Sequence, residues 1–250
     1  MSNDAAQRSA LPSTAKRVVQ AFLRPFGIHI ARIPKVPEPA GADKYFNTGA
    51  LTPFEENSVA LYDQFYGDSE ALEAYYGEGR TAFYTELSNL LRGKGVVADG
   101  RDILDVGCGS GHLLEALQSW SRPRSLSGCD FSQASVEFSQ RRLPGCEFFT
   151  HDIYQPLLGK FDVVLCTEVI EHLERPARGL RNLLDATRPG GTIVLTTPNG
   201  RLDTINEHIH FWSPESWKVF VEDECPGCTI DTTTFRNNHN NLAIVKKPKS

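Results

Sequence analysis

Two carboxylates and an imidazole lie close together in the stretch Glu168-Val-Ile-Glu171-His172. Their spacing of i, i+3 and i+4 places them on one side of a helical turn, where they can converge on a single ion. A neutral imidazole, with an ordinary pKa of about 6.5, also suits removal of a proton from a hydroxyl at neutral pH. The stretch therefore predicts a site for proton transfer or for a divalent metal. The ordinary alternative, that His172 caps a turn or bonds a backbone carbonyl, stays open.

A glycine-rich stretch, residues 102–117, predicts a strand, a tight turn and a helix in that order. Residues 103–106 form a short apolar run typical of a buried parallel strand, and leucines recur at helical spacing after the turn. Gly107, Gly109 and Gly111 alternate between them. Glycine lets a chain turn sharply and lets a ligand approach the backbone closely, at a cost in chain entropy that a plain turn would not require. The stretch therefore favours a nucleotide site.

Two common nucleotide motifs do not fit this turn. The pyrophosphate-binding fingerprint needs a glycine at position 112, where the chain has His112. A P-loop needs Gly-Lys-Ser or Gly-Lys-Thr after a longer spacer, and the sequence has neither. A different nucleotide is therefore expected.

Seven apolar segments that alternate with helical patterns must position these residues. The alternation predicts an α/β fold: a doubly wound, Rossmann-like, mainly parallel sheet with helices on both faces. Only Asn237–Asn240 separate the last two strands, which is hairpin length, so we expect the last strand to be antiparallel. The strands are expected at residues 102–106, 125–130, 146–150, 161–167, 191–197, 229–235 and 241–246, and the helices near 112–120, 132–142, 176–187 and 214–222.

Asp130 ends the second expected strand. In doubly wound folds an acid at this point accepts hydrogen bonds from both hydroxyls of a ribose, because two carboxylate oxygens match a vicinal diol. Its alternative role as the cap of the next helix is weaker, because Ser132 can serve as that cap. Phe131 would then lie beside the base of the nucleotide.

The pattern Asp105-x-Gly107-x-Gly109-x-Gly111 resembles the first motif of class I S-adenosylmethionine-dependent methyltransferases. An antiparallel last strand is also typical of their fold, and the unit from Glu168 to Leu173 resembles the ubiquinone-biosynthesis O-methyltransferase group, methyltransferase domain types 11 and 23. The resemblance spans about residues 96–220 and implies S-adenosylmethionine as the cofactor. It implies the following cofactor-binding residues: Asp105, Gly107, Cys108, Gly109, Gly111, Asp130, Phe131, Asp152, Ile153, Thr167, Glu168 and Arg80.

Some of these residues have a definite role in the family. Asp105 would lie near the methionine part of the cofactor, Asp152 would take the adenine amino group, and the backbone N–H of Ile153 would face the adenine ring. Arg80 would be a lid arginine that pairs with the cofactor carboxylate, a task that suits a guanidinium fork. Asp152 as an ordinary turn residue stays open.

The resemblance implies in-line methylation of an oxygen on a small molecule: a phenol or quinone precursor, a sugar or a secondary metabolite. A phenol or sugar hydroxyl must lose its proton, so we predict His172 as the general base and Glu171 as a catalytic partner that orients it. The acceptor pocket is expected at the carboxyl side of the sheet, where ligands bind in such folds. Its residues would be His208, His210, Trp212 and Asn199.

A second resemblance supports an alternative function, metal-dependent methylation of an RNA 3′ end. Glu168, Glu171, His172 and His208 together resemble the two-Glu, two-His metal site of small-RNA 3′-end 2′-O-methyltransferases. There a divalent ion holds the two terminal ribose hydroxyls, and such an ion would lower the pKa of a hydroxyl without a base. Metal-dependent RNA methylation is not the favoured hypothesis, because the acidic body lacks a basic groove for RNA and the loop around His208 matches only in part. A metal site without RNA stays open. A non-catalytic module that keeps the cofactor fold is the third hypothesis.

Three segments are expected along the chain: residues 1–40, a basic helix and a proline-rich linker; residues 41–95, an aromatic-rich helical lid; and residues 96–250, the S-adenosylmethionine-binding core. Residues 13–24 of the first segment form a basic amphipathic pattern that can pack on the domain or make peripheral contact with an anionic membrane. The lid is expected to be helical over residues 54–66 and 69–91, with a break near Gly77 and Gly79.

Net charge and hydropathy limit the kinds of binding partner and the cellular location that we expect. The 250 residues carry a net charge of −5, and because residues 1–37 carry +5 the remainder carries −10. An acidic body argues against extended nucleic-acid binding and leaves a small-molecule acceptor as the expected partner. The sequence has no bilayer-spanning apolar run and no signal peptide, so we expect a cytoplasmic protein. The acceptor, the choice of oxygen, nitrogen or carbon, and the oligomeric state stay open.

The six cysteines are expected to be free thiols, the usual state in an intracellular enzyme. Cys225-Pro-Gly-Cys228 has metal or redox spacing, but no second Cys-x-x-Cys pair accompanies it. An ordinary turn is the favoured interpretation.

Overall fold

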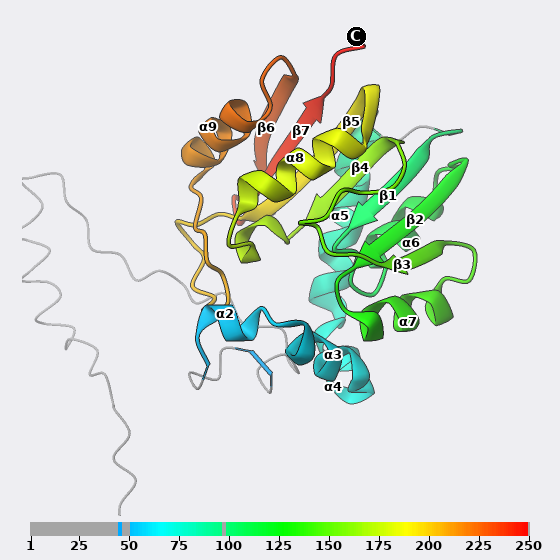
Figure 1. Cartoon of the computed structure of the whole chain (residues 1–250), viewed down its shortest axis with the longest axis vertical. Coiled ribbons are helices and arrows are strands. Elements are labelled where there is room, and N and C mark those ends of the chain that lie inside the picture. Colours follow the sequence, from blue (N-terminus) through cyan, green and yellow to red (C-terminus); the bar gives the residue numbers. More distant parts are fainter. Residues whose placement is uncertain (1–44, 47–50, 97–98, 250) are drawn as a thin grey trace, which may run out of the picture. The chain divides into compact units, whose positions relative to one another are not determined.

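A seven-stranded sheet with the strand order β3-β2-β1-β4-β5-β7-β6 forms the centre of the computed structural model (Figure 1). The structure describes residues 45–46, 51–96 and 99–249. The strands are β1 (Asp102–Val106), β2 (Ser125–Asp130), β3 (Glu147–Thr150), β4 (Phe161–Thr167), β5 (Thr187–Pro198), β6 (Thr229–Phe235) and β7 (Asn240–Lys246). The helices are α2 (Pro53–Glu56), α3 (Val59–Gly67), α4 (Ser69–Tyr75), α5 (Glu78–Gly93), α6 (His112–Gln118), α7 (Gln133–Arg142), the 3₁₀ turn η3 (Ile170–His172), α8 (Pro176–Ala186) and α9 (Pro214–Glu224).

The pairing of the strands confirms the predicted fold class. β1 to β5 pair in parallel, whereas β7 is antiparallel to both of its neighbours, β5 and β6. The connection between β6 and β7 is too short for a crossover, so the chain can only return beside β6 in the opposite direction. The doubly wound Rossmann-like sheet with an antiparallel last strand is therefore correct.

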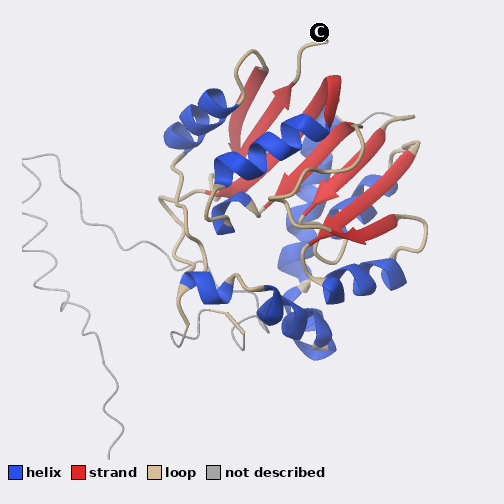
Figure 2. Cartoon of the chain, in the orientation of Figure 1, coloured by secondary structure: helices blue, strands red, loops and turns tan. Residues whose placement is uncertain are grey.

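Helices cover both faces of the sheet (Figures 1 and 2). On one face α5, α6 and α7 pack in one buried cluster with Ile103 of β1, and on the other α8 and α9 pack in a second cluster with Leu104. Successive strand residues point to opposite faces, which is why neighbours in β1 belong to different clusters. A strand buried on both sides reads as a continuous apolar run, and this made β1 and β4 recognisable in the sequence.

The helices ahead of the sheet differ from the expected pattern over residues 54–66. Residues 54–66 form two helices, because Asn57 ends α2 and Ser58 begins α3. Asparagine and serine at these positions compete with helical hydrogen bonding and favour caps. The break between α4 and α5 falls at Tyr76 and Gly77, close to its expected place. Phe83 and Leu87 of α5 belong to the cluster that contains β1, so α5 is packed as part of the core.

The expected division of the chain at residues 40 and 95 stays a prediction. The basic pattern of residues 13–24 and the linker lie outside the described residues. In the part of the chain that is described, no helix is both long and apolar enough to cross a membrane. All six cysteines are free, five of them buried, and the Cys228 N–H donates to the Cys225 carbonyl in a turn (3.2 Å).

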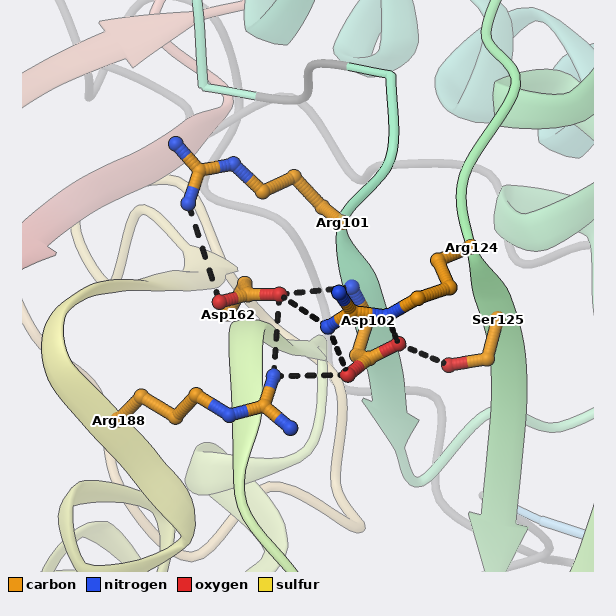
Figure 3. A network of polar contacts seen from close by, with 6 residues as sticks. All are labelled: Arg101, Asp102, Arg124, Ser125, Asp162 and Arg188. Carbon is orange, nitrogen blue, oxygen red and sulfur yellow. Dashed lines mark hydrogen bonds and ion pairs between the residues drawn. The ribbon is translucent and has the colours of Figure 1, made fainter.

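A network of ion pairs closes the amino ends of the central strands (Figure 3). Arg124 binds Asp102 through Nε and Nη2, and Nη1 of Arg188 lies 2.8 Å from Asp102 and 3.0 Å from Asp162. Ser125 also donates to Asp102 (2.9 Å). The hydrogen bonds from Arg124, together with those from Ser125 and Arg188, lower the pKa of Asp102 far below its ordinary value. Every carboxylate of this network is thus matched with a cation.

Candidate active site

The glycine turn follows β1 directly and has the predicted conformation. Gly107, Gly109 and Gly111 have φ values of 72°, 50° and 74°, in the left-handed region that other residues avoid. The N–H groups of Gly107 and Cys108 both donate to the Cys129 carbonyl of β2 (2.8 and 3.0 Å), which fixes the start of the turn. A Cβ at Gly109 would lie 2.7 Å from the Tyr66 hydroxyl, so the turn has no room for a side chain.

Two buried carboxyls flank this turn. Asp105 is 2% exposed, and its Oδ1 has no hydrogen-bond partner among the described residues. Burial, and then the charge of Asp130, raise its pKa to about 8. Asp130 accepts from the N–H groups of Gly109 and Ser132 (both 3.0 Å), and burial raises its pKa to about 6. Ser132 caps α7, as expected, which leaves Asp130 for another purpose.

Aromatic residues of α3 and α4 lie over the turn. The hydroxyls of Tyr66 and Tyr76 are 3.3 Å apart and both approach Gly109. Tyr62 contacts Phe131 edge to face, with ring centroids 5.0 Å apart. Asp63 accepts from the Ser132 hydroxyl (2.6 Å), which ties α3 to the start of α7. Figure 1 shows α2, α3 and α4 at the edge toward which the arrowheads of β1, β2 and β4 point.

Arg80 lies in the first turn of α5 and contacts Tyr75, the last residue of α4. Its guanidinium donates to the Tyr75 hydroxyl and lies 4.6 Å from the centre of that ring. Its Nε has no partner among the described residues. The attraction of Glu168 also acts on this guanidinium. Arg80 is thus held beside the turn by an aromatic ring, with one donor left over.

Glu168 follows β4 in an unusual backbone conformation, with a φ of 55°. Its carboxylate accepts from the Thr196 hydroxyl (2.8 Å) and from the side-chain amide of Asn240 (3.0 Å). Burial raises its pKa even though these hydrogen bonds act in the opposite direction. A left-handed non-glycine residue is strained and persists only where its surroundings hold it. Here that strain directs the carboxylate toward β5 and β7.

Glu171, His172 and His208 converge at the same edge. One ligand atom of each lies within 4.8 Å of the others, and the two imidazole rings meet edge to face with centroids 4.7 Å apart. The convergence depends on the backbone, because the N–H groups of Ile209 and His210 both donate to the Glu171 carbonyl (2.9 and 3.1 Å). These bonds attach the loop after β5 to the turn after β4.

Burial disfavours the charged forms of both Glu171 and His172 in this cluster. Glu171 is fully buried, and neither of its carboxyl oxygens has a hydrogen-bond partner in the described part of the chain. Burial, followed by the charge of Glu168, raises its pKa well above the ordinary value. Burial also lowers the pKa of His172 well below 6.5, so the imidazole is neutral at physiological pH. The His172 ring donates to the Glu207 backbone carbonyl, while Nδ1 is left without a partner among the described residues.

A family model described as a methyltransferase domain matches residues 76–224, more than half of the chain. The chain belongs to this methyltransferase family. With its fold and its motifs, it is a class I S-adenosylmethionine-dependent methyltransferase, as the sequence predicted.

Curated relatives and solved structures agree with this assignment. A ubiquinone biosynthesis O-methyltransferase of Pseudomonas paraeruginosa is 32% identical over 107 residues, which cover 40% of this chain and 45% of the relative. The chain spans less than half the length of this relative. A DhpI complex with SAH has a TM-score of 0.61 at 16% identity, covering 79% of this chain and 98% of that chain. Magnesium protoporphyrin IX methyltransferase of Synechocystis with bound SAM has a TM-score of 0.56 at 19% identity, covering 79% and 98%. At these identities the two structures support the fold alone.

The methyltransferase uses the four expected pocket residues unequally. His208 joins the cluster, whereas the other three make contacts that hold the loops. His210 bonds the Leu173 carbonyl (2.9 Å), and Trp212 packs on Trp217 and Phe220 in the second core cluster. Asn199 donates to the Asn238 carbonyl (2.8 Å) and accepts from the Arg201 N–H.

The remaining predicted residues also have defined places. Asp152 is exposed and accepts from the Tyr154 N–H in a turn (2.9 Å). Its role in adenine binding stays a prediction. Ile153 and Thr167 are buried near the carboxyl ends of β3 and β4. Cys108 has its side chain buried in the first core cluster, so only its backbone borders the turn.

Three residues near the site carried no signal in the sequence. Tyr66 and Tyr76 could not be separated from other aromatic residues of the helices, because their approach to Gly109 is a long-range contact. Asp203, on the loop after β5, lies 2.6 Å from Nδ1 of His208. A spacing of five residues brings two side chains together in neither a helix nor a strand, and this segment is a loop. The sequence therefore did not indicate that Asp203 would contact His208.

Proposed function

We propose that this methyltransferase transfers the methyl group of S-adenosylmethionine to a hydroxyl of a small molecule, with His172 as the general base. The acceptor class is a phenol or quinone precursor, a sugar or a secondary metabolite. The observation that carries the proposal is the neutral His172 ring, with an unbonded Nδ1, next to Glu171 and His208. The similarity to ubiquinone biosynthesis O-methyltransferases supports oxygen as the atom that is methylated.

The residues around the glycine turn fit the cofactor. Asp130 offers a carboxylate held by two backbone N–H groups, with lone pairs left to accept from the ribose hydroxyls. Asp105 has an unpaired buried oxygen that a positively charged methionine group would compensate. The Cα of Gly109 faces the hydroxyls of Tyr66 and Tyr76, which places two further hydrogen-bonding groups beside the turn. When bound, S-adenosylmethionine supplies an electrophilic methyl group whose departure leaves a neutral thioether.

His172 has the protonation state that its role requires. An acceptor hydroxyl titrates far above pH 7 and must give up its proton as the oxygen attacks. The His172 ring is neutral and has its other nitrogen held by the Glu207 carbonyl, so Nδ1 is the atom that can take this proton. The neighbouring carboxyl of Glu171 lies where it can accept a hydrogen bond from the protonated ring.

The test combines turnover with cofactor binding. Tritiated S-adenosylmethionine and a panel of phenols, catechols and sugars identify an acceptor, and calorimetry with S-adenosylhomocysteine measures cofactor affinity. His172→Ala is expected to reduce turnover by roughly 10²–10⁴-fold and to leave cofactor affinity nearly unchanged. His151→Ala, on a histidine outside the cluster, is the matched control. Unchanged turnover of His172→Ala would remove this residue from the mechanism.

A second candidate function is metal-assisted O-methylation of an acceptor with two adjacent hydroxyls, of which the ribose at an RNA 3′ end is one. The buried, unpartnered carboxyl of Glu171 beside two imidazoles favours it, because a divalent cation would compensate that carboxyl. Glu171, His172 and His208 would hold the ion, and the ion would lower the pKa of a bound hydroxyl. Glu168, the fourth expected ligand, is instead bonded to Thr196 and Asn240.

Chelation separates the two candidates. If a metal is required, EDTA abolishes turnover and added Mg²⁺ or Mn²⁺ restores it, and Glu171→Gln loses this response while the exposed Glu174→Gln keeps it. Turnover that is indifferent to EDTA eliminates the second candidate. A charge of −10 on residues 38–250 makes RNA the weaker of the two acceptors, and a comparison of a catechol with an RNA 3′ end in the same assay tests this.

We also propose that partners of this enzyme are small acceptors and, through residues 13–24, an anionic membrane surface. The basic amphipathic pattern of that segment supports the membrane contact. Deletion of residues 1–37 is expected to abolish sedimentation with anionic vesicles. An equal bound fraction after the deletion would exclude the membrane contact.

A further inference from the structure

Asp203 is a buried acid that the proposed reaction does not use. It lies on the loop between β5 and α9, and its side chain is 2% exposed. Both of its carboxylate oxygens are engaged: Oδ1 accepts from the Ile205 N–H (3.1 Å), and Oδ2 lies 2.6 Å from Nδ1 of His208. The backbone N–H of Asp203 donates to the Asn199 carbonyl (3.0 Å), which fixes the residue at the end of β5.

A turn alone does not explain this arrangement. Asp152 forms the same kind of turn, with its Oδ1 accepting from the N–H two residues later (2.9 Å), but Asp152 is exposed. Burial of a carboxylate costs free energy unless the charge is paired and hydrogen-bonded. Burial of the Asp203 carboxylate costs free energy that the exposed Asp152 does not lose. The contact with His208 is the interaction that offsets this cost.

That contact decides which nitrogen of His208 carries the proton. A carboxylate next to Nδ1 favours the form in which Nδ1 bears the hydrogen and Nε2 keeps a lone pair. Nδ1 is occupied by Asp203, so Nε2 is the atom left to take part in the cluster with Glu171 and His172. Metal-binding and catalytic histidines are commonly held in this way by a carboxylate on the far side of the ring.

We propose that Asp203 is a positioning residue that fixes the tautomer and the orientation of His208, so that the Nε2 lone pair faces Glu171 and His172. The inference rests on the proposed function, in which this cluster activates the acceptor hydroxyl. It holds both for a site without metal, where Nε2 receives a hydrogen bond, and for a site with metal, where Nε2 is a ligand. Asp203 touches neither the acceptor nor the cofactor and acts through His208.

The tautomer can be measured directly on the full chain. Long-range ¹H–¹⁵N correlation spectra of ¹⁵N-histidine-labelled protein distinguish the protonated from the unprotonated ring nitrogen, and His208→Gln identifies the His208 signals. In the wild type, Nδ1 of His208 is expected to be protonated and Nε2 unprotonated. In Asp203→Asn, Oδ1 can still accept from the Ile205 N–H while the amide N–H₂ faces Nδ1, so the two nitrogen signals are expected to exchange their character. Asp152→Asn is the matched control and leaves the His208 signals unchanged.

Two results would overturn the proposal: a wild-type His208 with the proton on Nε2, or a variant Asp203→Asn with the wild-type tautomer. The first needs no variant of Asp203, so it decides the matter even if the substitution impairs folding. Calorimetry with S-adenosylhomocysteine on the same samples keeps the proposed function separate. If the tautomer exchanges as expected but the wild type methylates no hydroxyl, the proposed function fails and the role of Asp203 stands.

Discussion

The two ends of β1 carry the same residue type in opposite environments. Asp102 begins the strand in the ion-pair network of Figure 3, where hydrogen bonds from Arg124 lower its pKa. Asp105, three residues later, is buried without a partner for its Oδ1, and its pKa is raised to about 8. One carboxylate is matched with cations inside the protein, whereas burial favours the protonated form of the other until a bound cation stabilises its charge.

The contrast extends across the sheet. At the amino edge, Asp102 and Asp162 share Arg188, so these acids serve stability. At the carboxyl edge, Glu171 has no partner for either oxygen within the described residues, and Asp130 has a raised pKa. Buried carboxyls whose ionised form the fold does not stabilise have raised pKa values, and such groups are candidates for binding a ligand or taking part in a reaction. The comparison therefore locates function at one edge of the sheet and stability at the other.

The largest effect on the carboxyl edge is expected from the glycine turn. Gly109→Ala forces a Cβ to within 2.7 Å of the Tyr66 hydroxyl at a φ of 50°, in the turn that we propose binds the cofactor. We expect S-adenosylhomocysteine affinity to fall by roughly 100-fold in calorimetry. Gly145→Ala, whose Cβ meets nothing closer than 4.0 Å, is the control. Wild-type affinity in Gly109→Ala would show that the cofactor does not use this turn.

Asp130→Ala removes the carboxylate that we propose binds the ribose. Because hydrogen bonds to a charged group contribute roughly 1.5–3 kcal/mol, S-adenosylhomocysteine affinity is expected to fall by about 10- to 150-fold. The matched variant Asp152→Ala removes an exposed acid and is expected to have the smaller effect. A larger loss in Asp152→Ala than in Asp130→Ala would reverse the order of the two residues.

The pH dependence of cofactor binding sharpens the same point. An ordinary aspartate has a pKa of 3.8, but in the free protein that of Asp130 is about 6. We propose that the ribose hydroxyls bond the ionised form. Protonation of Asp130 therefore adds a loss of affinity of up to tenfold per unit as the pH decreases through about 6, beyond the loss that protonation of Asp105 causes below about 8. Calorimetry at several pH values from about 7.5 to 5 measures the slope. Asp130→Asn should lose only the added slope below about pH 6, and an unchanged slope there would assign it to another group.

The smallest effect is expected at the amino edge, on stability alone. Arg188→Ala leaves Asp102 and Asp162 with fewer donors and is expected to lower the free energy of unfolding by roughly 1–2 kcal/mol, without a change in cofactor affinity. Arg181→Ala breaks a more exposed ion pair with Glu224 and should change stability by less than about 0.5 kcal/mol. Chemical denaturation of both variants tests this prediction. A loss of cofactor binding in Arg188→Ala would contradict the assignment of stability alone to the amino edge.

Local features of the sequence were enough to predict the sheet and the cofactor edge. β1, the glycine turn and Asp130 lie within one continuous pattern, so their relation in space follows from their relation in the chain. The contact between Asp203 and His208 and the approach of Tyr66 to Gly109 could not be predicted, because they depend on how distant segments pack. Asn199 shows that the correct edge does not ensure a role in the site. It lies at the carboxyl edge, but its side-chain amide bonds backbone groups of nearby loops.

Calorimetry of S-adenosylhomocysteine binding to Asp105→Asn and Asp102→Asn tests the central claim most directly. Both variants replace a carboxylate by an amide on the same strand, only three residues apart. We expect Asp105→Asn to weaken binding by roughly tenfold or more, measured above pH 8 where Asp105 is ionised, because we propose that its carboxylate pairs with the methionine part of the cofactor. Asp102→Asn should bind within about twofold of the wild type while it unfolds more easily. Equal affinities in the two variants, or weaker binding in Asp102→Asn, would contradict the assignment of function to the carboxyl edge.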